Sequence, residues 1–129
     1  MPDFSISSQE RLSQCDLRLQ KICNEVIKYF DFTIVDGYRN KEKQNNLFYS
    51  GQSKLKYPHS KHNEFPSRAV DIAPYPINWN DKERFYLLAG MMFAVAEWQN
   101  IPIRWGGDWN KNWKFSDQSF HDLPHFELI

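Results

Sequence analysis

Hydrophobic positions recur at helical spacing near the start of the chain and gather into short runs farther along. From Ser8 to Phe30 apolar residues follow a period close to 3.6, with polar residues opposite. This spacing predicts one packing helix. A second helix is expected over Lys82–Gln99, capped by Asn80 or Asp81, and its apolar residues occur nearly all round, which indicates central burial. A shorter helix is expected over Lys41–Ser50.

Four short runs of apolar and β-branched residues predict strands. They are Phe32–Asp36, Ala69–Ala73, Ile101–Trp105 and His125–Ile129. The polar stretch from Gly51 through Pro66 predicts a loop. Because helices and strands alternate without the rhythm of a parallel sheet, we expect an α+β fold with one small antiparallel sheet packed by helices. The 129 residues predict a single domain, with its packing helix at about 8–30 and the part that carries the candidate metal site, described below, at about 35–129.

Composition excludes several classes of protein. Hydrophobic residues make up 41% of the chain and aromatic residues 16%, too many for a disordered segment. The 16 basic and 16 acidic residues balance, and no block of one sign points to nucleic acid or a membrane surface. The first residues lack a basic start followed by an apolar run, and no stretch is long enough to span a membrane. We therefore expect a protein made in the cytoplasm without membrane insertion. We also expect it to be a monomer.

Two cysteines lie on the first expected helix. Cys15 and Cys23 are eight residues apart, or roughly 12 Å along a helix axis. This separation is too large for a disulfide, so both are expected to be reduced core residues.

Two histidines and one aspartate form a candidate metal site. His62, Asp71 and His125 would supply two imidazoles and a carboxylate, a set typical of catalytic zinc with an open fourth position. Spacing alone also allows three unrelated surface residues. However, Asp71 lies inside an apolar strand, where an unpaired carboxylate is unfavourable. It needs a cation, either a metal shared with His62 or a salt bridge to Arg39 or Arg68.

The last expected strand alternates in polarity. His125 and Glu127 share one face, while Phe126 and Leu128 share the other. Glu127 is therefore a candidate acceptor that orients a ligand histidine. The alternative is a solvated edge strand.

Three segments resemble the M15 metallopeptidases. They are Ser60–Asp71, WGGDW at Trp105–Trp109 and DLPH at Asp122–His125. The resemblance spans about Val35 to Ile129 and is greatest to the phage endolysins described as L-alanyl-D-glutamate peptidases, with the D-alanyl-D-alanine carboxypeptidases as more distant relatives. It implies a hedgehog/DD-peptidase-like single domain that binds Zn²⁺.

In that family a Ser-x-His followed by Ala-x-Asp supplies two zinc ligands. Ser60, His62, Ala69 and Asp71 occupy these places here, although the segment between them is two residues longer than usual and lacks the usual glycine. His59 is the rival ligand in this loop, but no serine lies two residues before it, and we expect it to be exposed. Together with the last zinc histidine of the family's second motif, which His125 matches, the resemblance implies His62, Asp71 and His125 as the metal ligands.

The family's second motif has an acid three residues before its last zinc histidine. Asp122 fits this position and would act as general base, with Glu127 and His121 as alternatives. A simpler interpretation of Asp122 is a turn residue before Pro124.

Other family positions imply contacts with substrate. Arg39 matches an arginine that faces the substrate near the metal and would offset developing charge. Ser60 and Gln44 match polar substrate contacts, and all three could equally be surface or loop residues that bond locally.

The role of WGGDW is left open. Its two glycines permit unusual backbone turns. Trp105 and Trp109 either wall a cleft or pack the core, and we expect packing. Asp108 either orients a ligand or caps the turn.

The resemblance implies a peptidoglycan hydrolase. The expected reaction is cleavage of the L-alanyl-D-glutamate bond in stem peptides during phage lysis, after the protein leaves the cytoplasm through a membrane pore. Two alternatives remain: a D-alanyl-D-alanine carboxypeptidase, and a non-catalytic wall-binding module whose zinc is structural.

Overall fold

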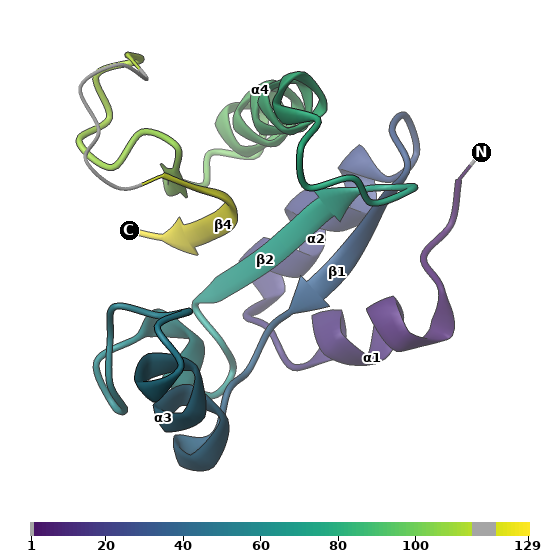
Figure 1. Ribbon diagram of the computed structural model, residues 1–129. Helices are drawn as coiled ribbons and strands as arrows, with labels where there is room; N and C mark the ends of the chain where they lie inside the picture. The colour runs from purple at the N-terminus through teal and green to yellow at the C-terminus, as the bar shows by residue number, and fades with distance from the viewer. Residues whose placement is uncertain (1, 115–120) are drawn as a thin grey trace.

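The computed structural model describes residues 2–114 and 121–129. Helices and strands are interspersed along the chain (Figure 1). In chain order the elements are α1 (Ile6–Ser13), α2 (Leu17–Val26), β1 (Phe32–Asp36), α3 (Lys41–Tyr49), the short 3-10 helix η1 (Lys61–Asn63), β2 (Ala69–Pro74), α4 (Lys82–Trp98), β3 (Ile103–Gly106) and β4 (Asp122–Leu128). The strands form one four-stranded sheet in the order β1-β2-β4-β3, and each neighbouring pair is antiparallel. The predicted antiparallel sheet packed by helices is confirmed.

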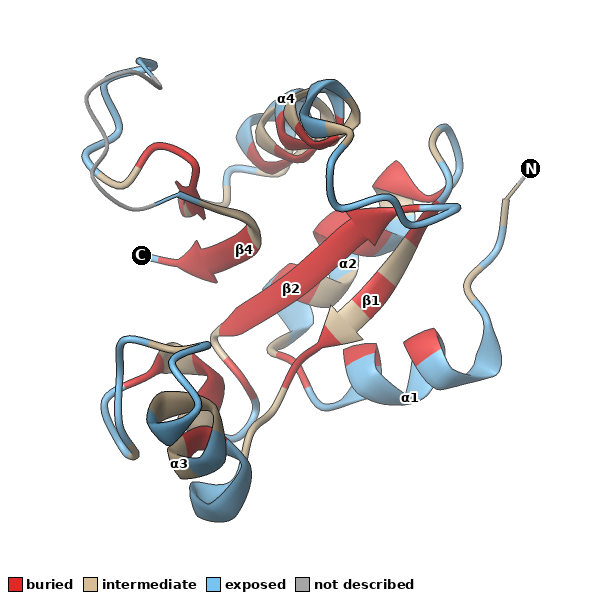
Figure 2. Cartoon of the chain, in the orientation of Figure 1, coloured by how far each residue is buried: buried red, intermediate tan, exposed pale blue. Residues whose placement is uncertain are grey.

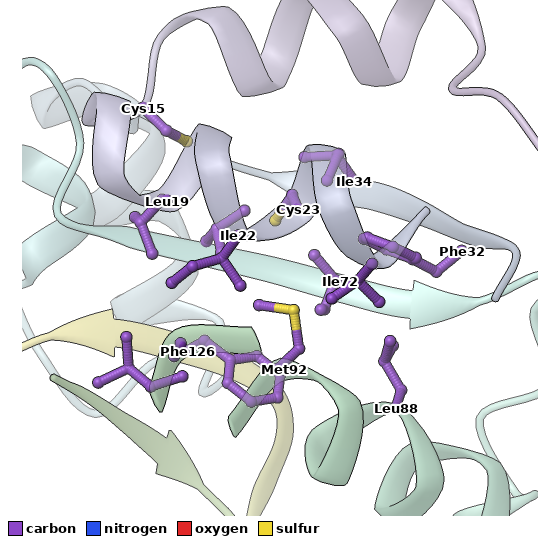
Figure 3. Packing of buried hydrophobic residues seen from close by; sticks show 14 of the residues in the cluster. Cys15, Leu19, Ile22, Cys23, Phe32, Ile34, Ile72, Leu88, Met92 and Phe126 are labelled. Atoms are coloured by element: carbon purple, nitrogen blue, oxygen red, sulfur yellow. The ribbon is translucent and has the colours of Figure 1, made fainter. Parts of the chain in front are cut away.

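One face of the sheet carries the hydrophobic core. Side chains that alternate along β2 and β4 turn toward α2 and α4, as strand geometry requires. Figure 3 shows Ile22 of α2, Ile72 of β2 and Met92 of α4 directed toward one another, and all three are fully buried. Both faces of β2 are covered along its length (Figure 2). The side chains on its second face are therefore buried too, although they do not belong to this core.

The predicted single helix over residues 8–30 is wrong, because the chain breaks there into α1 and α2 (Figure 1). The helical region also begins earlier, at Ile6, and ends at Val26, before the expected Phe30. Asp16 caps α2 by accepting a hydrogen bond from the Arg18 backbone N–H at 2.9 Å. The break is also held by Ser67, whose backbone bonds to Gln14 and Asp16. Because the apolar period continues across these residues, periodicity alone concealed the break.

The prediction that α4 is centrally buried is also wrong. Phe85, Leu88 and Met92 pack against the sheet, but Leu87 and Trp98 are 56% and 76% exposed on the outer side. An apolar composition therefore did not mean burial on every side. Asp81 is the N-cap residue, although its side chain makes no capping bond. Within the described residues, no helix has the length and apolarity needed to cross a membrane.

The ends of the last two strands differ from prediction. β3 begins at Ile103 and not at Ile101, while β4 begins at Asp122, three residues before the expected start. Gly106 pairs with Asp122 and Trp105 pairs with Phe126, so β4 has extra residues between these two pairs. Pro124 lies in this irregular part, where its missing N–H interrupts no regular ladder.

Candidate metal centre

Three side chains from separate segments meet on the second, polar face of the sheet. Asp71 on β2 pairs across the strands with His125 on β4, so their side chains point to the same side. His62 lies on η1. Ser60 caps this turn by accepting from the His62 N–H, and the Asn63 side chain accepts from the Ser60 N–H. The reciprocal capping fixes the orientation of His62, and all three candidate ligands are buried.

The three atoms that face one another are nearly equidistant. Asp71 Oδ1 lies 3.3 Å from His62 Nε2 and 3.2 Å from His125 Nδ1, and the two nitrogens are 3.3 Å apart. Ligand atoms at zinc-binding distance in a tetrahedral site lie roughly 3.4 Å apart. The triangle of donors therefore fits a divalent metal.

The other nitrogen of each histidine bonds to an acceptor outside the triangle. His62 Nδ1 donates to the Gly37 carbonyl oxygen at 2.6 Å, and His125 Nε2 donates to Glu127 Oε1 at 2.8 Å. Each neutral imidazole must then turn a lone pair inward. Two lone pairs and a carboxylate oxygen thus converge in a buried space, an arrangement that is favourable only with a cation between them.

The shifted pKa values of the cluster also indicate that it needs a cation. Burial alone would raise the pKa of Asp71, but the charges and hydrogen bonds of His62 and His125 hold it well below its usual value. Burial would likewise lower the pKa of His125, yet its hydrogen bonds to Asp71 and Glu127 raise it to about 9. A proton on His125 is thus the simplest cation that satisfies the cluster, and a metal ion competes with it.

The sequence left two kinds of partner open for Asp71, a shared metal site and a salt bridge, and Asp71 contacts side chains of both kinds. Its Oδ1 faces the two histidines, while its Oδ2 accepts from Arg39 Nη2 at 2.8 Å. Arg68 is not its partner, since the Arg68 side chain donates to the Ile129 carbonyl oxygen. A salt bridge and a metal site are therefore compatible at this aspartate.

Arg39 also joins Asp71 to a second buried carboxylate. Arg39 Nε donates to Asp36 Oδ2 at 2.6 Å, and Lys43 Nζ lies 2.8 Å from Asp36 Oδ1. Simple alternation along β1 would place Asp36 on the core face with Ile34. A register shift between these two residues instead turns Asp36 to the polar face opposite Asp71. For this reason sequence reasoning missed Asp36.

The candidate ligands line a pocket of about 350 Å³. Its walls come from the loop before η1 and from the polar face of β3 and β4. The lining residues are Arg39, Gln52, Ser53, Lys54, Leu55, His59, Ser60, Lys61, His62, Asp71, Arg104, Trp109, Asp122, His125 and Glu127. His59 lies in this wall and is exposed, as predicted.

Asp122 lines the same pocket from the start of β4. It is half-buried, and burial followed by the negative charge of Asp71 raises its pKa. The alternative bases are less suitable. Burial would raise the pKa of Glu127, but its bonds to His125 and Arg104 lower it to about 2. His121 is exposed outside the pocket lining.

The two predicted substrate contacts have different surroundings. Ser60 lines the pocket, although its hydroxyl also caps η1. Gln44 is fully buried and absent from the lining. Its amide donates to Ser53 Oγ and to the Leu55 carbonyl oxygen, and its Oε1 accepts from Asn63. This placement favours a positioning role for Gln44, which fixes the loop wall, over the predicted contact with substrate.

The two tryptophans of WGGDW separate in role. Trp105 packs in the core, as predicted, and its indole N–H donates to the Leu123 carbonyl oxygen at 2.7 Å. Trp109 instead lines the pocket, with its ring centroid 5.4 Å from that of His125, so the expectation of core packing was wrong for it. Asp108 caps the turn by accepting from the Trp113 N–H at 2.7 Å.

The glycines of this motif are required for close approach. Neither has the positive φ that a special turn would need. A Cβ on Gly106 would overlap the Asp122 backbone, and one on Gly107 would overlap the Trp105 ring. The expectation that they permit unusual turns was wrong, and their small size instead brings Asp122 against β3.

Comparison with known proteins agrees with this geometry. The chain matches the family described as phage L-alanyl-D-glutamate peptidase over residues 2–129. It belongs to that family. A relative in this group is the L-alanyl-D-glutamate peptidase of Escherichia phage T5, which is 31% identical over 134 residues and is matched over 98% of this chain and 97% of its own length.

A solved structure has the same fold. The Serratia marcescens L-Ala D-Glu endopeptidase ChiX superposes with a TM-score of 0.78 at 22% sequence identity, covering 98% of this chain and 90% of that one. The fold predicted from the M15 resemblance is confirmed. Membership of this peptidase family likewise confirms the prediction of a hydrolytic enzyme of the phage endolysin type.

Proposed function

We propose that this chain, as a single catalytic domain over residues 1–129, is a zinc-dependent peptidase that hydrolyses the L-alanyl-D-glutamate bond of peptidoglycan stem peptides. The observation that carries the proposal is the buried triangle of His62, Asp71 and His125. Its donor atoms lie within 4.8 Å of one another and line a pocket that also holds Asp122. The family name and the name of the phage T5 relative supply the bond.

His62, Asp71 and His125 would hold the metal, with Glu127 orienting His125. Bound there, a zinc ion would polarise the scissile carbonyl and acidify the attacking water. Asp122 would take the proton from that water and pass it to the leaving amine. Its raised pKa favours holding the proton between these two transfers.

Arg39 and Ser60 complete the proposed site. The Arg39 guanidinium holds the Asp71 carboxylate and lines the pocket. It would therefore keep Asp71 oriented while adding positive charge near the developing oxyanion. Ser60 would contact substrate from the pocket wall.

The identity of the cleaved bond is tested by incubating the protein with purified stem peptides and measuring the masses of the fragments by mass spectrometry. Cleavage after the first L-alanine is expected. Release of one terminal alanine would instead indicate a D-alanyl-D-alanine carboxypeptidase. Intact peptides at full zinc occupancy would favour the non-catalytic wall-binding module.

The metal is tested by elemental analysis of the purified protein beside its His62→Ala variant. About one zinc per chain is expected for the wild type and a large loss for the variant, because three protein ligands are reduced to two. A folded variant that retains full zinc would remove His62 from the metal site.

The place of action follows from the substrate. We infer that the protein is made in the cytoplasm and reaches the wall through a membrane pore during lysis. We further propose that it acts as a monomer. Cells that produce the protein should lyse only when a pore-forming protein is co-expressed, and this result would support the route.

A further inference from the structure

One end of the pocket has more positive than negative charge. Glu127 Oε2 accepts from Arg104 Nη2 at 2.7 Å and from Arg104 Nε at 3.2 Å, and Lys61 Nζ lies 3.2 Å from the same oxygen. The other Glu127 oxygen bonds to His125. Two cations therefore face one carboxylate here, and all three side chains line the pocket.

The opposite end has no such excess. In the lining there, Arg39 faces Asp71, and Asp122 adds a second carboxyl group, so cations do not outnumber carboxyl groups. A metal held by the histidines and Asp71 would add further positive charge between the two ends. The pocket as a whole therefore suits an anionic group, and the Arg104 end suits it best.

Arg104 can bind a second anion without giving up the first. It lies on β3 directly opposite Glu127 of β4. Its two bonds to Glu127 use Nε and Nη2, and within residues 2–114 and 121–129 no bond engages Nη1. The Arg104 side chain is 38% exposed, so a group in the pocket can reach it. Anchored in this way, the guanidinium is ordered before a ligand arrives.

The proposed substrate carries a matching group. A glutamyl residue has two carboxyl groups, and when one continues the peptide chain the other stays free. That free carboxylate lies roughly 4–6 Å from the scissile carbonyl carbon by standard bond lengths. Arg104 lies opposite Glu127, two residues along β4 from His125, or roughly 7 Å by strand geometry.

We propose that Arg104, supported by Lys61, binds the free carboxylate of the glutamate next to the scissile bond and so selects for a glutamyl residue at that position. The inference rests on the proposed function. It concerns recognition only and leaves the bond-breaking step to the residues named above.

The experiment compares two peptides that differ at one group. The first is the stem peptide, and the second has its free glutamate carboxylate replaced by a carboxamide of the same shape. The wild type should prefer the carboxylate by roughly 10–100-fold in kcat/KM, the range of a charge-assisted hydrogen bond. Arg104→Gln should reduce this preference to nearly one, and Lys61→Gln should reduce it in part.

The ratio separates recognition from support of the metal site. If Arg104 acted only through Glu127 and His125, its loss would slow both peptides equally and leave the preference unchanged. The matched control is Arg18→Gln, because Arg18 also donates from Nε and Nη2 to one carboxylate, that of Asp16, on the surface away from the pocket. It should keep the wild-type ratio.

Binding without turnover gives a second measure. Calorimetry with the Asp122→Asn protein should show the same preference for the carboxylate peptide, and its loss with Arg104→Gln. A wild type that cleaves both peptides equally, or an Arg104→Gln protein that keeps the full preference, would overturn the inference and leave the peptidase standing. A zinc-loaded wild type that cleaves neither peptide would overturn the proposed function itself.

Discussion

Asp36 and Asp71 lie directly opposite each other across β1 and β2, and the Arg39 guanidinium binds both. Their side chains are only 10% and 12% exposed, and like charges opposed in this way destabilise an antiparallel pair. Arg39 offsets this repulsion. It also fixes Asp71 so that Oδ1 faces the two histidines. The stability of the sheet and the geometry of the candidate metal centre therefore depend on the same side chain.

Replacing Arg39 should destabilise the protein even without metal. Arg39→Gln leaves two buried carboxylates without their shared cation, which is expected to cost about 3–5 kcal/mol. Denaturant unfolding of chelator-treated protein measures the change. Arg18→Gln is the control, because its ion pair with Asp16 is exposed and should contribute little. Equal losses in the two variants would contradict the role given to Arg39.

Replacing Asp122 should separate metal binding from hydrolysis. Asp122→Asn keeps the shape of the side chain but cannot accept the proton, so hydrolysis of the stem peptide should fall roughly 10²–10⁴-fold. Zinc content should stay at the wild-type level, because Asp122 is not part of the triangle. The exposed Asp31→Asn serves as control. Unchanged hydrolysis by the Asp122 variant would remove this residue from the mechanism.

Much of the fold was predictable because local sequence rules apply to it. Phe32–Asp36 is a strand with the predicted bounds, and Ala69–Ala73 differs from β2 by one residue. The residues His62, Asp71 and His125 were also candidates, because a carboxylate in an apolar strand needs a cation and because the motifs of the resembling family place metal ligands at these three positions. The structure brings these three together, as expected of metal ligands.

The remaining features depend on contacts between distant segments. Asp36 reaches the site only through a register shift, and Gly37 contributes a backbone carbonyl oxygen, which no side-chain pattern reveals. Arg104 becomes part of the pocket only because β3 pairs with β4 in one register. None of these relationships leaves a local pattern, so each becomes visible only after the chain has folded.

Glu127 should control metal affinity through His125. Glu127→Gln weakens the acceptor that orients the imidazole, so zinc affinity is expected to fall about 10–100-fold. Competition with a chromogenic chelator measures this affinity. Glu64→Gln, at an exposed glutamate outside the pocket lining, should leave it unchanged. Equal affinities in both variants would contradict the orienting role.

Replacing either of two glycines with alanine should change the stability of the protein, but in opposite directions. A Cβ at Gly106 would overlap the Asp122 backbone, so Gly106→Ala should cost about 1–3 kcal/mol and displace the general base. Gly90 lies in α4 with open space around it, and Gly90→Ala should stabilise the protein by about 0.5–1 kcal/mol. Thermal unfolding measures both. A tolerated Gly106→Ala with full activity would show that β3 and β4 can separate without loss.

The two buried thiols should make the protein lose stability at alkaline pH. Burial, followed by the charges of Asp36 and Asp71, raises the pKa of Cys15 to about 12, and burial raises that of Cys23 further. In the unfolded chain a thiol ionises near pH 8.5. Below that pH both states hold the proton and the thiols have no effect. Above it only the unfolded chain releases protons, so each thiol lowers the free energy of unfolding by about 1.4 kcal/mol per pH unit.

Denaturant unfolding at pH 8 and pH 10 in the presence of a reductant measures this loss. Tyrosine and lysine residues also titrate in this range, so the control is the Cys15→Ala, Cys23→Ala double variant, which retains their contribution and lacks that of the thiols. The wild type should lose more stability than the double variant between the two pH values. A thiol reagent at pH 8 should modify both cysteines only after unfolding, because both are free and buried. Equal pH dependence in the two proteins would mean that the thiols ionise as readily in the folded state as in the unfolded chain.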